Sequence, residues 1–100
     1  MILHTINKSP FEKPTLESCL KHCKPGSSIL LIEDGIYAAL KNTKYSHLVT
    51  DALSEHRFYV LEPDLNARGV QDQLIDGIGK VSYEGFVDLT VEHDTVSAWL

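Results

Sequence analysis

Short apolar runs separated by stretches of helical periodicity are the feature that most constrains the fold of this chain. Runs of this length are typical of strands buried on both faces of a sheet. Strands are expected at residues 2–6, 29–32, 58–61, 80–83 and 95–100. Helical pieces are expected at residues 15–23, 36–41, 46–56, 64–68 and 84–92. Strands that alternate with helices need crossover connections, so we expect an α/β fold of about five mostly parallel strands with helices on both faces.

Composition limits the class of protein. The 100 residues suffice for one domain, residues 1–100, and the formal net charge is −5. No basic stripe of the kind that binds nucleic acid is present, so we expect no direct contact with nucleic acid. No run approaches the ~20 apolar residues of a membrane span. The start, MILHTINKSP, lacks the pattern of a signal peptide. We therefore expect a cytoplasmic protein with reduced thiols.

Both cysteines of the chain lie in LESCLKHC, residues 16–23. Leu16, Cys19, Leu20 and Cys23 follow i, i+3, i+4, i+7 spacing, which predicts one apolar stripe on a helix. At about 100° per residue, Cys23 falls near the centre of this stripe and Cys19 at its edge, beside His22. The helix start should lie at the carboxyl edge of the sheet, where such folds bind ligands. We therefore expect Cys19 to be reachable by solvent and Cys23 to be buried.

Cys19 is accordingly the candidate for thiol chemistry. The helix dipole and the His22 imidazole would stabilise its thiolate, whereas Glu17 would oppose ionisation. The alternative is that Cys19 only fills the core as a small hydrophobic residue. On this assignment Cys19→Ser leaves folding nearly intact, and Cys23→Ser costs about 1–2 kcal/mol.

Two other uses of the cysteines are disfavoured. Cβ atoms four residues apart on a helix are roughly 5–6 Å apart, too far for a disulfide. Cys19, Cys23 and His22 supply at most three metal ligands, so neither a metal nor another cofactor is expected.

The remaining unusual residues have structural explanations. His4 is expected to be a hydrogen-bonded residue of the first strand. The other histidines outside the cysteine helix are expected at solvated positions: His47, His56 and His93. Trp99 must dock, either within its own chain or against another subunit. No nucleophile elbow or phosphate-binding loop is present.

Several segments together resemble the DsrH/TusB family. They are ILHTINKSPF, SILLIEDGIYAAL, YVLEPDLNARGV, GFVDLT and the final AWL, in the family's order and spacing from residue 2 to residue 100. The cysteine of LESCL matches a DsrH cysteine that many TusB sequences lack, so the chain looks closer to DsrH than to typical TusB.

The resemblance implies a DsrE-like (flavodoxin-like) domain that works in a heterohexamer with DsrE/TusD-like and DsrF/TusC-like subunits. Such complexes relay sulfur as a cysteine persulfide between TusA-like and DsrC/TusE-like carriers. The role implied first is that of a DsrEFH-type subunit in intracellular sulfur oxidation. The alternatives are a TusB-type subunit in the synthesis of wobble 2-thiouridine in tRNA, or a structural subunit without chemistry.

The resemblance also bears on the site. The principal acceptor cysteine of these complexes is assigned to the DsrE or TusD subunit. Cys19 would then be an accessory persulfide carrier with His22 as thiolate stabiliser, which makes the chain at most a sulfurtransferase subunit. Its interfaces are expected at the loop NKSPFEKP, residues 7–14, and at the C-terminal strand.

Overall fold

A computed structural model describes residues 1–100. Five strands form one sheet: β1 (Ile2–Ile6), β2 (Ser28–Leu31), β3 (Arg57–Leu61), β4 (Gly79–Val81) and β5 (Thr95–Trp99). The strand order is β4-β3-β2-β1-β5, and every neighbouring pair is parallel. The expected mostly parallel α/β fold is confirmed.

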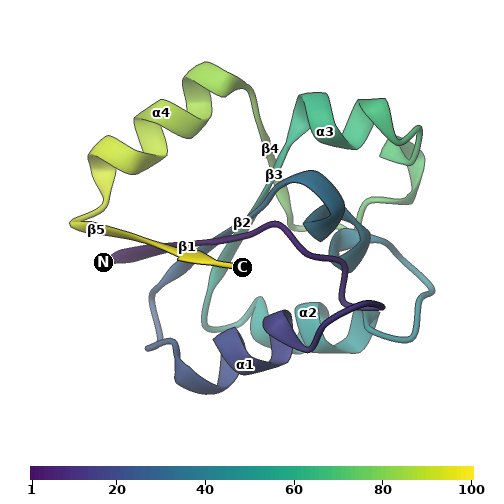
Figure 1. Cartoon of the computed structure of the whole chain (residues 1–100), viewed down its shortest axis with the longest axis horizontal. Coiled ribbons are helices and arrows are strands. Elements are labelled where there is room, and N and C mark those ends of the chain that lie inside the picture. The colour runs from purple at the N-terminus through teal and green to yellow at the C-terminus, as the bar shows by residue number, and fades with distance from the viewer.

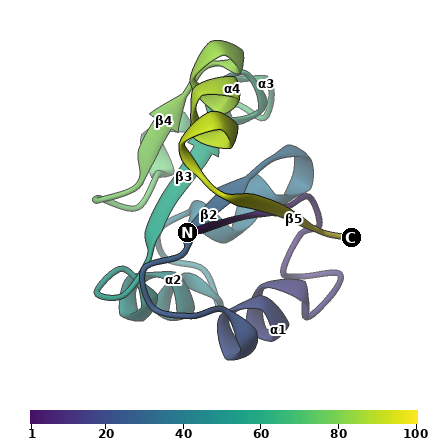
Figure 2. The same ribbon diagram turned by 90° about the vertical axis from the view of Figure 1, so that its left-hand side faces the viewer.

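Four α-helices and two 3-10 helices connect the strands. They are α1 (Thr15–His22), η1 (Glu33–Ala39), α2 (Ser46–Ala52), α3 (Glu62–Ala67), η2 (Gln71–Gln73) and α4 (Tyr83–Glu92). Helices α1 and α2 lie on one side of the sheet, and α3 and α4 lie on the other (Figure 1). Figure 2 shows the same two layers from the side, with the N-terminus beside β5.

Each strand sends alternate side chains to opposite faces of the sheet. On β2, Ile29 and Leu31 belong to the larger core cluster beneath α1 and α2, whereas Leu30 belongs to a small cluster with Leu89 of α4. The continuous apolar run in the sequence therefore reflects burial on both faces, as expected for a parallel sheet.

Two helices differ from expectation. The helix expected at 36–41 is a 3-10 helix that begins earlier, at Glu33, which has a positive φ of 50°. The helix expected over 46–56 ends at Ala52. After it, a turn brings His56 to the start of β3, where its backbone N–H donates to the Ala52 carbonyl (2.9 Å).

Candidate functional site

Helix α1 buries Cys19, whereas the helical wheel placed this residue at the edge of the apolar stripe. The buried residues of α1 are Thr15, Leu16 and Cys19, and Cys19 is 0% exposed. The expectation that Cys19 is reachable by solvent is wrong. The stripe on the wheel was drawn from Leu16, Cys19, Leu20 and Cys23 alone, and the burial of Thr15 shifts the centre of the buried face towards Cys19.

Burial also changes the acidity of Cys19. Desolvation, followed by the neighbouring Cys23, raises the pKa of the Cys19 thiol to about 12. The thiol is therefore protonated at neutral pH. This is the opposite of an activated thiolate, which needs a lowered pKa.

His22 lies on the exposed side of α1. Its Nδ1 is 2.7 Å from the Ser18 carbonyl oxygen, to which it donates. No hydrogen bond joins His22 to Cys19, so the structure does not bring together the expected carrier and its expected stabiliser.

Cys23 is the cysteine that reaches the surface, and the expectation that it is buried is wrong. It is partly exposed and follows the last helical residue, His22. Its backbone is extended (φ −77°, ψ 145°), so the angular position given by a continuous helix no longer applies. Burial raises the pKa of the Cys23 thiol, while its hydrogen bond with Cys19 acts in the opposite direction.

Two buried histidines complete a cluster around these thiols. The ligand atoms of His4, Cys19 and Cys23 all lie within 4.8 Å of one another. His56 Nε2 lies 3.5 Å from the Cys23 sulfur. His4 and His56 are each 6% exposed. Burial, with His56 as a further cause, lowers the pKa of His4. The cluster therefore contains two thiols and two imidazoles beneath the end of α1.

The hydrogen bonds of His4 and His56 show which ring nitrogen of each neutral imidazole carries the proton. Trp99 Nε1 donates to His4 Nδ1 (3.0 Å), so Nε2 of a neutral His4 carries the proton. That Nε2 is buried without a hydrogen-bond partner. His56 Nδ1 donates to the Ser27 carbonyl oxygen (3.3 Å), which leaves the Nε2 lone pair facing Cys23. Trp99 thus docks within its own chain.

Sequence reasoning missed this cluster. The expected solvation of His56 is wrong, and so is that of His93, which bonds to Ser28 Oγ and the Leu89 carbonyl oxygen. His4 makes the expected structural hydrogen bond, but through only one of its nitrogens. The position of His56, two residues before the apolar run 58–61, was the one sequence signal for its burial.

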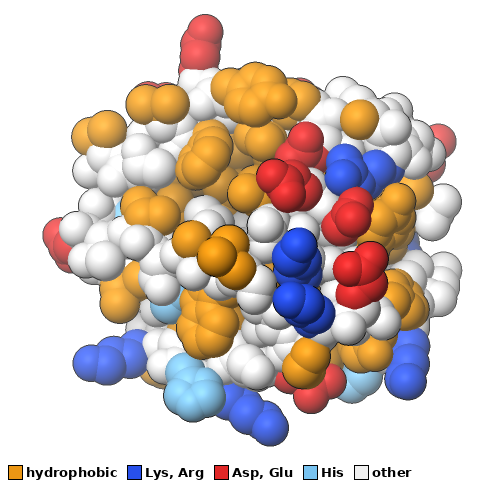
Figure 3. Space-filling model, in the orientation of Figure 1, with side chains coloured by type: hydrophobic (Ala, Val, Ile, Leu, Met, Phe, Trp, Pro, Cys, Tyr) orange, Lys and Arg blue, Asp and Glu red, His pale blue; other side chains and the backbone are white.

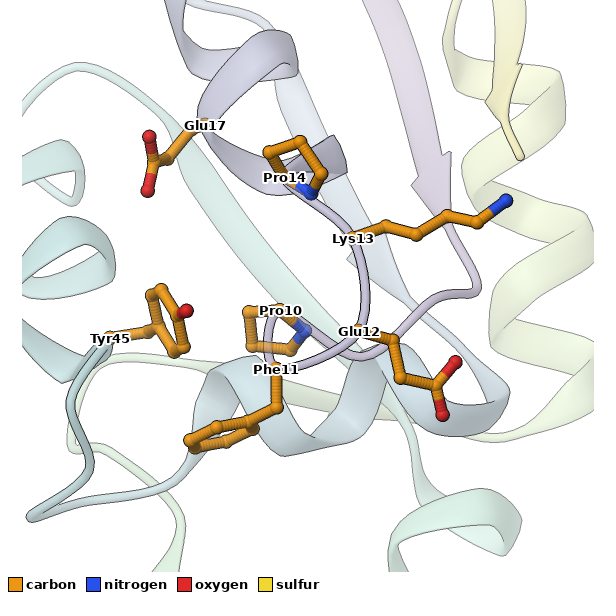
Figure 4. Close-up of a pocket in the computed structure, with 7 residues that line it drawn as sticks. All are labelled: Pro10, Phe11, Glu12, Lys13, Pro14, Glu17 and Tyr45. Carbon is orange, nitrogen blue, oxygen red and sulfur yellow. The ribbon is translucent and has the colours of Figure 1, made fainter.

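A separate shallow pocket lies at the carboxyl edge of the sheet (Figure 4). The β1–α1 loop supplies most of it, and Phe11 packs edge-on against Tyr45 with ring centroids 5.0 Å apart. Glu12, Lys13 and Glu17 give it mixed charge. Neither cysteine lines it.

Apolar side chains are exposed along α4, on β5 and at the residue that follows it. Five large hydrophobic side chains are exposed there: Tyr83, Val87, Val91, Val96 and Leu100. We call these residues the α4–β5 patch. In Figure 3, hydrophobic side chains gather over the region occupied by α4. None of the helices has the length and apolar character needed to span a membrane.

Solved structures share the fold at low sequence identity. The crystal structure of the ychN protein from E. coli has a TM-score of 0.79 at 15% identity and covers 98% of this chain and 97% of its own. The MTH1491 protein of Methanobacterium thermoautotrophicum has a TM-score of 0.76 at 16% identity, with coverage of 97% and 96%. At these identities the likeness concerns the fold alone.

Sequence comparisons are more specific. The family model described as DsrH like protein matches residues 8–96. Protein TusB of Pectobacterium parmentieri is 36% identical over 99 residues, covering 98% of this chain and all of that protein. Protein TusB of Klebsiella pneumoniae (strain 342) is 36% identical over 98 residues with the same coverage. The chain therefore belongs to the DsrH/TusB family of sulfur-relay proteins.

Proposed function

We propose that this protein is a TusB-type subunit of a cytoplasmic relay that carries persulfide sulfur towards 2-thiouridine in tRNA. The observation that favours this function over sulfur oxidation is that relatives named TusB match the chain from end to end at 36% identity. The preference for DsrH rested on the matching cysteine at position 19, and the structure buries that residue instead of presenting it as a reactive thiol. A relay based on reduced thiols needs a reducing compartment, which favours the cytoplasm.

The proposed contribution of this subunit is assembly, with the main acceptor cysteine on a partner. A nucleophilic thiol must be ionised and reachable by its donor, and Cys19 is neither in the folded chain. A persulfide on Cys19 remains a prediction that would require α1 to open. Cys23, which is partly exposed, is the better placed of the two sulfurs for contact with a carrier protein.

The α4–β5 patch supports a role in assembly. Val91 and Leu100 are 80% and 78% exposed, although both are apolar. Exposed apolar patches of this kind mark protein interfaces on soluble domains. We therefore place a contact with a TusC-like or TusD-like subunit on this patch, which includes the C-terminal strand expected from the sequence.

Complementation tests the function. The chain would replace TusB in a bacterium that lacks it, and 2-thiouridine in total tRNA would be measured by liquid chromatography and mass spectrometry. Restored thiolation is expected. A chain that co-purifies with the TusC and TusD subunits but leaves tRNA unthiolated would contradict the proposal.

A matched pair of variants tests the interface. Val91→Asp places a charge on the α4–β5 patch and should abolish co-purification with the partners. Thr50→Asp, on the exposed side of α2, is the control and should co-purify normally. Equal co-purification of both variants would remove the patch from the interface.

Sulfur oxidation with DsrE-like and DsrF-like partners is the second candidate function. The observation in its favour is that the matching family model is described as DsrH like. Co-expression with each pair of partner subunits separates the two functions, because a stable complex with only the DsrE-like and DsrF-like pair would favour sulfur oxidation.

Persulfide transfer itself can be followed on the intact complex. After incubation with a persulfide donor, peptide mass spectrometry would detect a gain of about 32 Da on any cysteine that accepts a sulfur atom. The expected result is an adduct on a partner subunit and none on Cys19. An adduct on Cys19 in the folded complex would restore its role as a carrier, with His22 to be tested next.

A further inference from the structure

The buried cluster of two thiols and two imidazoles has a feature that packing does not explain. His4 is 6% exposed, yet its Nε2 has no hydrogen-bond partner. A buried polar atom without a partner costs free energy comparable to a lost hydrogen bond. A ring nitrogen of His4 lies within 4.8 Å of both cysteine sulfurs, and Nε2 is the nitrogen that the hydrogen bond from Trp99 leaves free. The cost is removed if a ligand of the cluster occupies the space between them.

We propose that His4, Cys19, Cys23 and His56 bind a thiophilic metal ion, with Zn²⁺ as the ion that this ligand set fits. Zinc prefers four ligands, drawn from thiolates and imidazoles, in a tetrahedral arrangement. Two thiolates and two neutral imidazoles around Zn²⁺ give a complex without net charge, which suits a buried position. The inference concerns the chain itself and does not depend on the tRNA function.

One distance in the cluster already matches that of a bound site. Zn–S bonds of about 2.3 Å and Zn–N bonds of about 2.0 Å place ligand atoms roughly 3.3–3.8 Å apart. His56 Nε2 and Cys23 Sγ are already 3.5 Å apart. The group of His4, Cys19 and Cys23 spans up to 4.8 Å, so its atoms must approach by about 1 Å in closing on an ion. His56 touches this group only at Cys23, so its ring must also move towards the other two ligands.

The ring of His56 is already held in an orientation that suits metal binding. A histidine that binds a metal donates its other ring N–H to a carbonyl or carboxylate, which fixes the ring and the tautomer. His56 does so to the Ser27 carbonyl oxygen, and its Nε2 lone pair is available. Cys23 follows the last residue of α1 and is partly exposed, which gives the ion a route into the cluster.

His4 must change its tautomer when it binds. In the structure Nδ1 accepts from the Trp99 indole, so the proton is on Nε2. Binding moves this proton to Nδ1, and the indole N–H must then leave because two donors cannot face each other. Cys19 and Cys23 each lose one proton, so one Zn²⁺ enters and two protons are released. Trp99 is the single tryptophan of the chain, which makes its fluorescence a reporter of occupancy.

Metal titration of the full chain tests the proposal. Reduced protein is freed of metal with a chelator that is then removed, and Zn²⁺ is added in competition with a chromophoric chelator. One ion per chain and a change in Trp99 fluorescence at the same stoichiometry are expected. Co²⁺ in place of Zn²⁺ should give a thiolate charge-transfer band and the strong visible bands of a tetrahedral complex.

Variants identify the ligands. Cys23→Ser and His56→Ala should each weaken zinc binding by at least about tenfold. His22→Ala and His47→Ala are matched controls, because both histidines are exposed, and they should bind as the parent does. Trp99→Phe removes the competing donor and should bind roughly fivefold more tightly.

Several results would contradict the proposed metal site. No ion above background, or binding that Cys23→Ser and His56→Ala leave unchanged, would refute it. So would a Co²⁺ spectrum without the thiolate band. Loss of binding in His22→Ala together with unchanged binding in His56→Ala would assign the metal to the helix surface instead. Variants that fail to fold are recognised by circular dichroism, and the parent's Co²⁺ spectrum then decides alone.

Discussion

Exchanging each cysteine for serine is the sharpest stability test of the structure. Cys19 is 0% exposed in the larger core cluster, whereas Cys23 is partly exposed at the end of α1. The two substitutions change the same atom, sulfur to oxygen, four residues apart. Their different effects on the free energy of unfolding therefore measure burial.

The magnitude follows from burying a hydroxyl. An unsatisfied hydroxyl in a protein interior costs about 1–3 kcal/mol. A serine inside a helix can bond back to the carbonyl four residues earlier, which offsets part of this cost. We expect Cys19→Ser to destabilise by about 1–2 kcal/mol. Cys23→Ser should stay within about 0.5 kcal/mol, as for most substitutions near the surface.

Urea unfolding followed by circular dichroism measures both values, with chelator and reductant present so that neither metal nor oxidation contributes. In thermal unfolding, 1 kcal/mol corresponds to about 4–8 °C in Tm for a chain near this size. Cys19→Ala separates loss of packing from burial of the hydroxyl and should destabilise less than Cys19→Ser. If Cys23→Ser is the more destabilised variant, the placement of the two sulfurs is wrong.

Three further outcomes are expected. Gly35→Ala should lower Tm by more than about 8 °C, because a Cβ there would overlap the Ile6 carbonyl oxygen and lie 3.0 Å from its carbon; an unchanged Tm would refute this close approach. Iodoacetamide should label Cys23 of the metal-free native protein and label Cys19 only after denaturation, as read by peptide mass spectrometry. Burial lowers the pKa of His4 below its ordinary 6.5, so between the folded and the unfolded pKa the unfolded state binds more protons. The free energy of unfolding of the metal-free protein should therefore fall as pH drops below 6.5. His4→Gln should reduce this dependence of stability on pH.

The sequence was a reliable guide to the sheet. The apolar runs at 2–6 and 58–61 became β1 and β3, with at most one further residue at either end. Such runs are local signals, because a strand buried on both faces is apolar at every position. The alternation of strands and helices then fixed parallel pairing, since each crossover returns the chain in the same direction.

The helices that surround the site were less well predicted. A helical wheel assumes that the helix continues, but α1 ends at His22 and Cys23 turns away in extended backbone. A wheel also weighs side chains by polarity, and Thr15 is buried despite its hydroxyl. These two details were enough to exchange the positions of the two cysteines.

The sequence by itself therefore determined the α/β class, the family and the approximate strands, all of which depend on local pattern or on order along the chain. Tertiary structure alone decided which sulfur is buried and which imidazoles lie beside it. His4 and His56 are 52 residues apart in sequence (56 − 4) and reach Cys23 only through the adjacent placement of β1, β2 and β3 beneath α1. No spacing rule detects such a cluster, because its members lie on separate elements that only sheet pairing brings together.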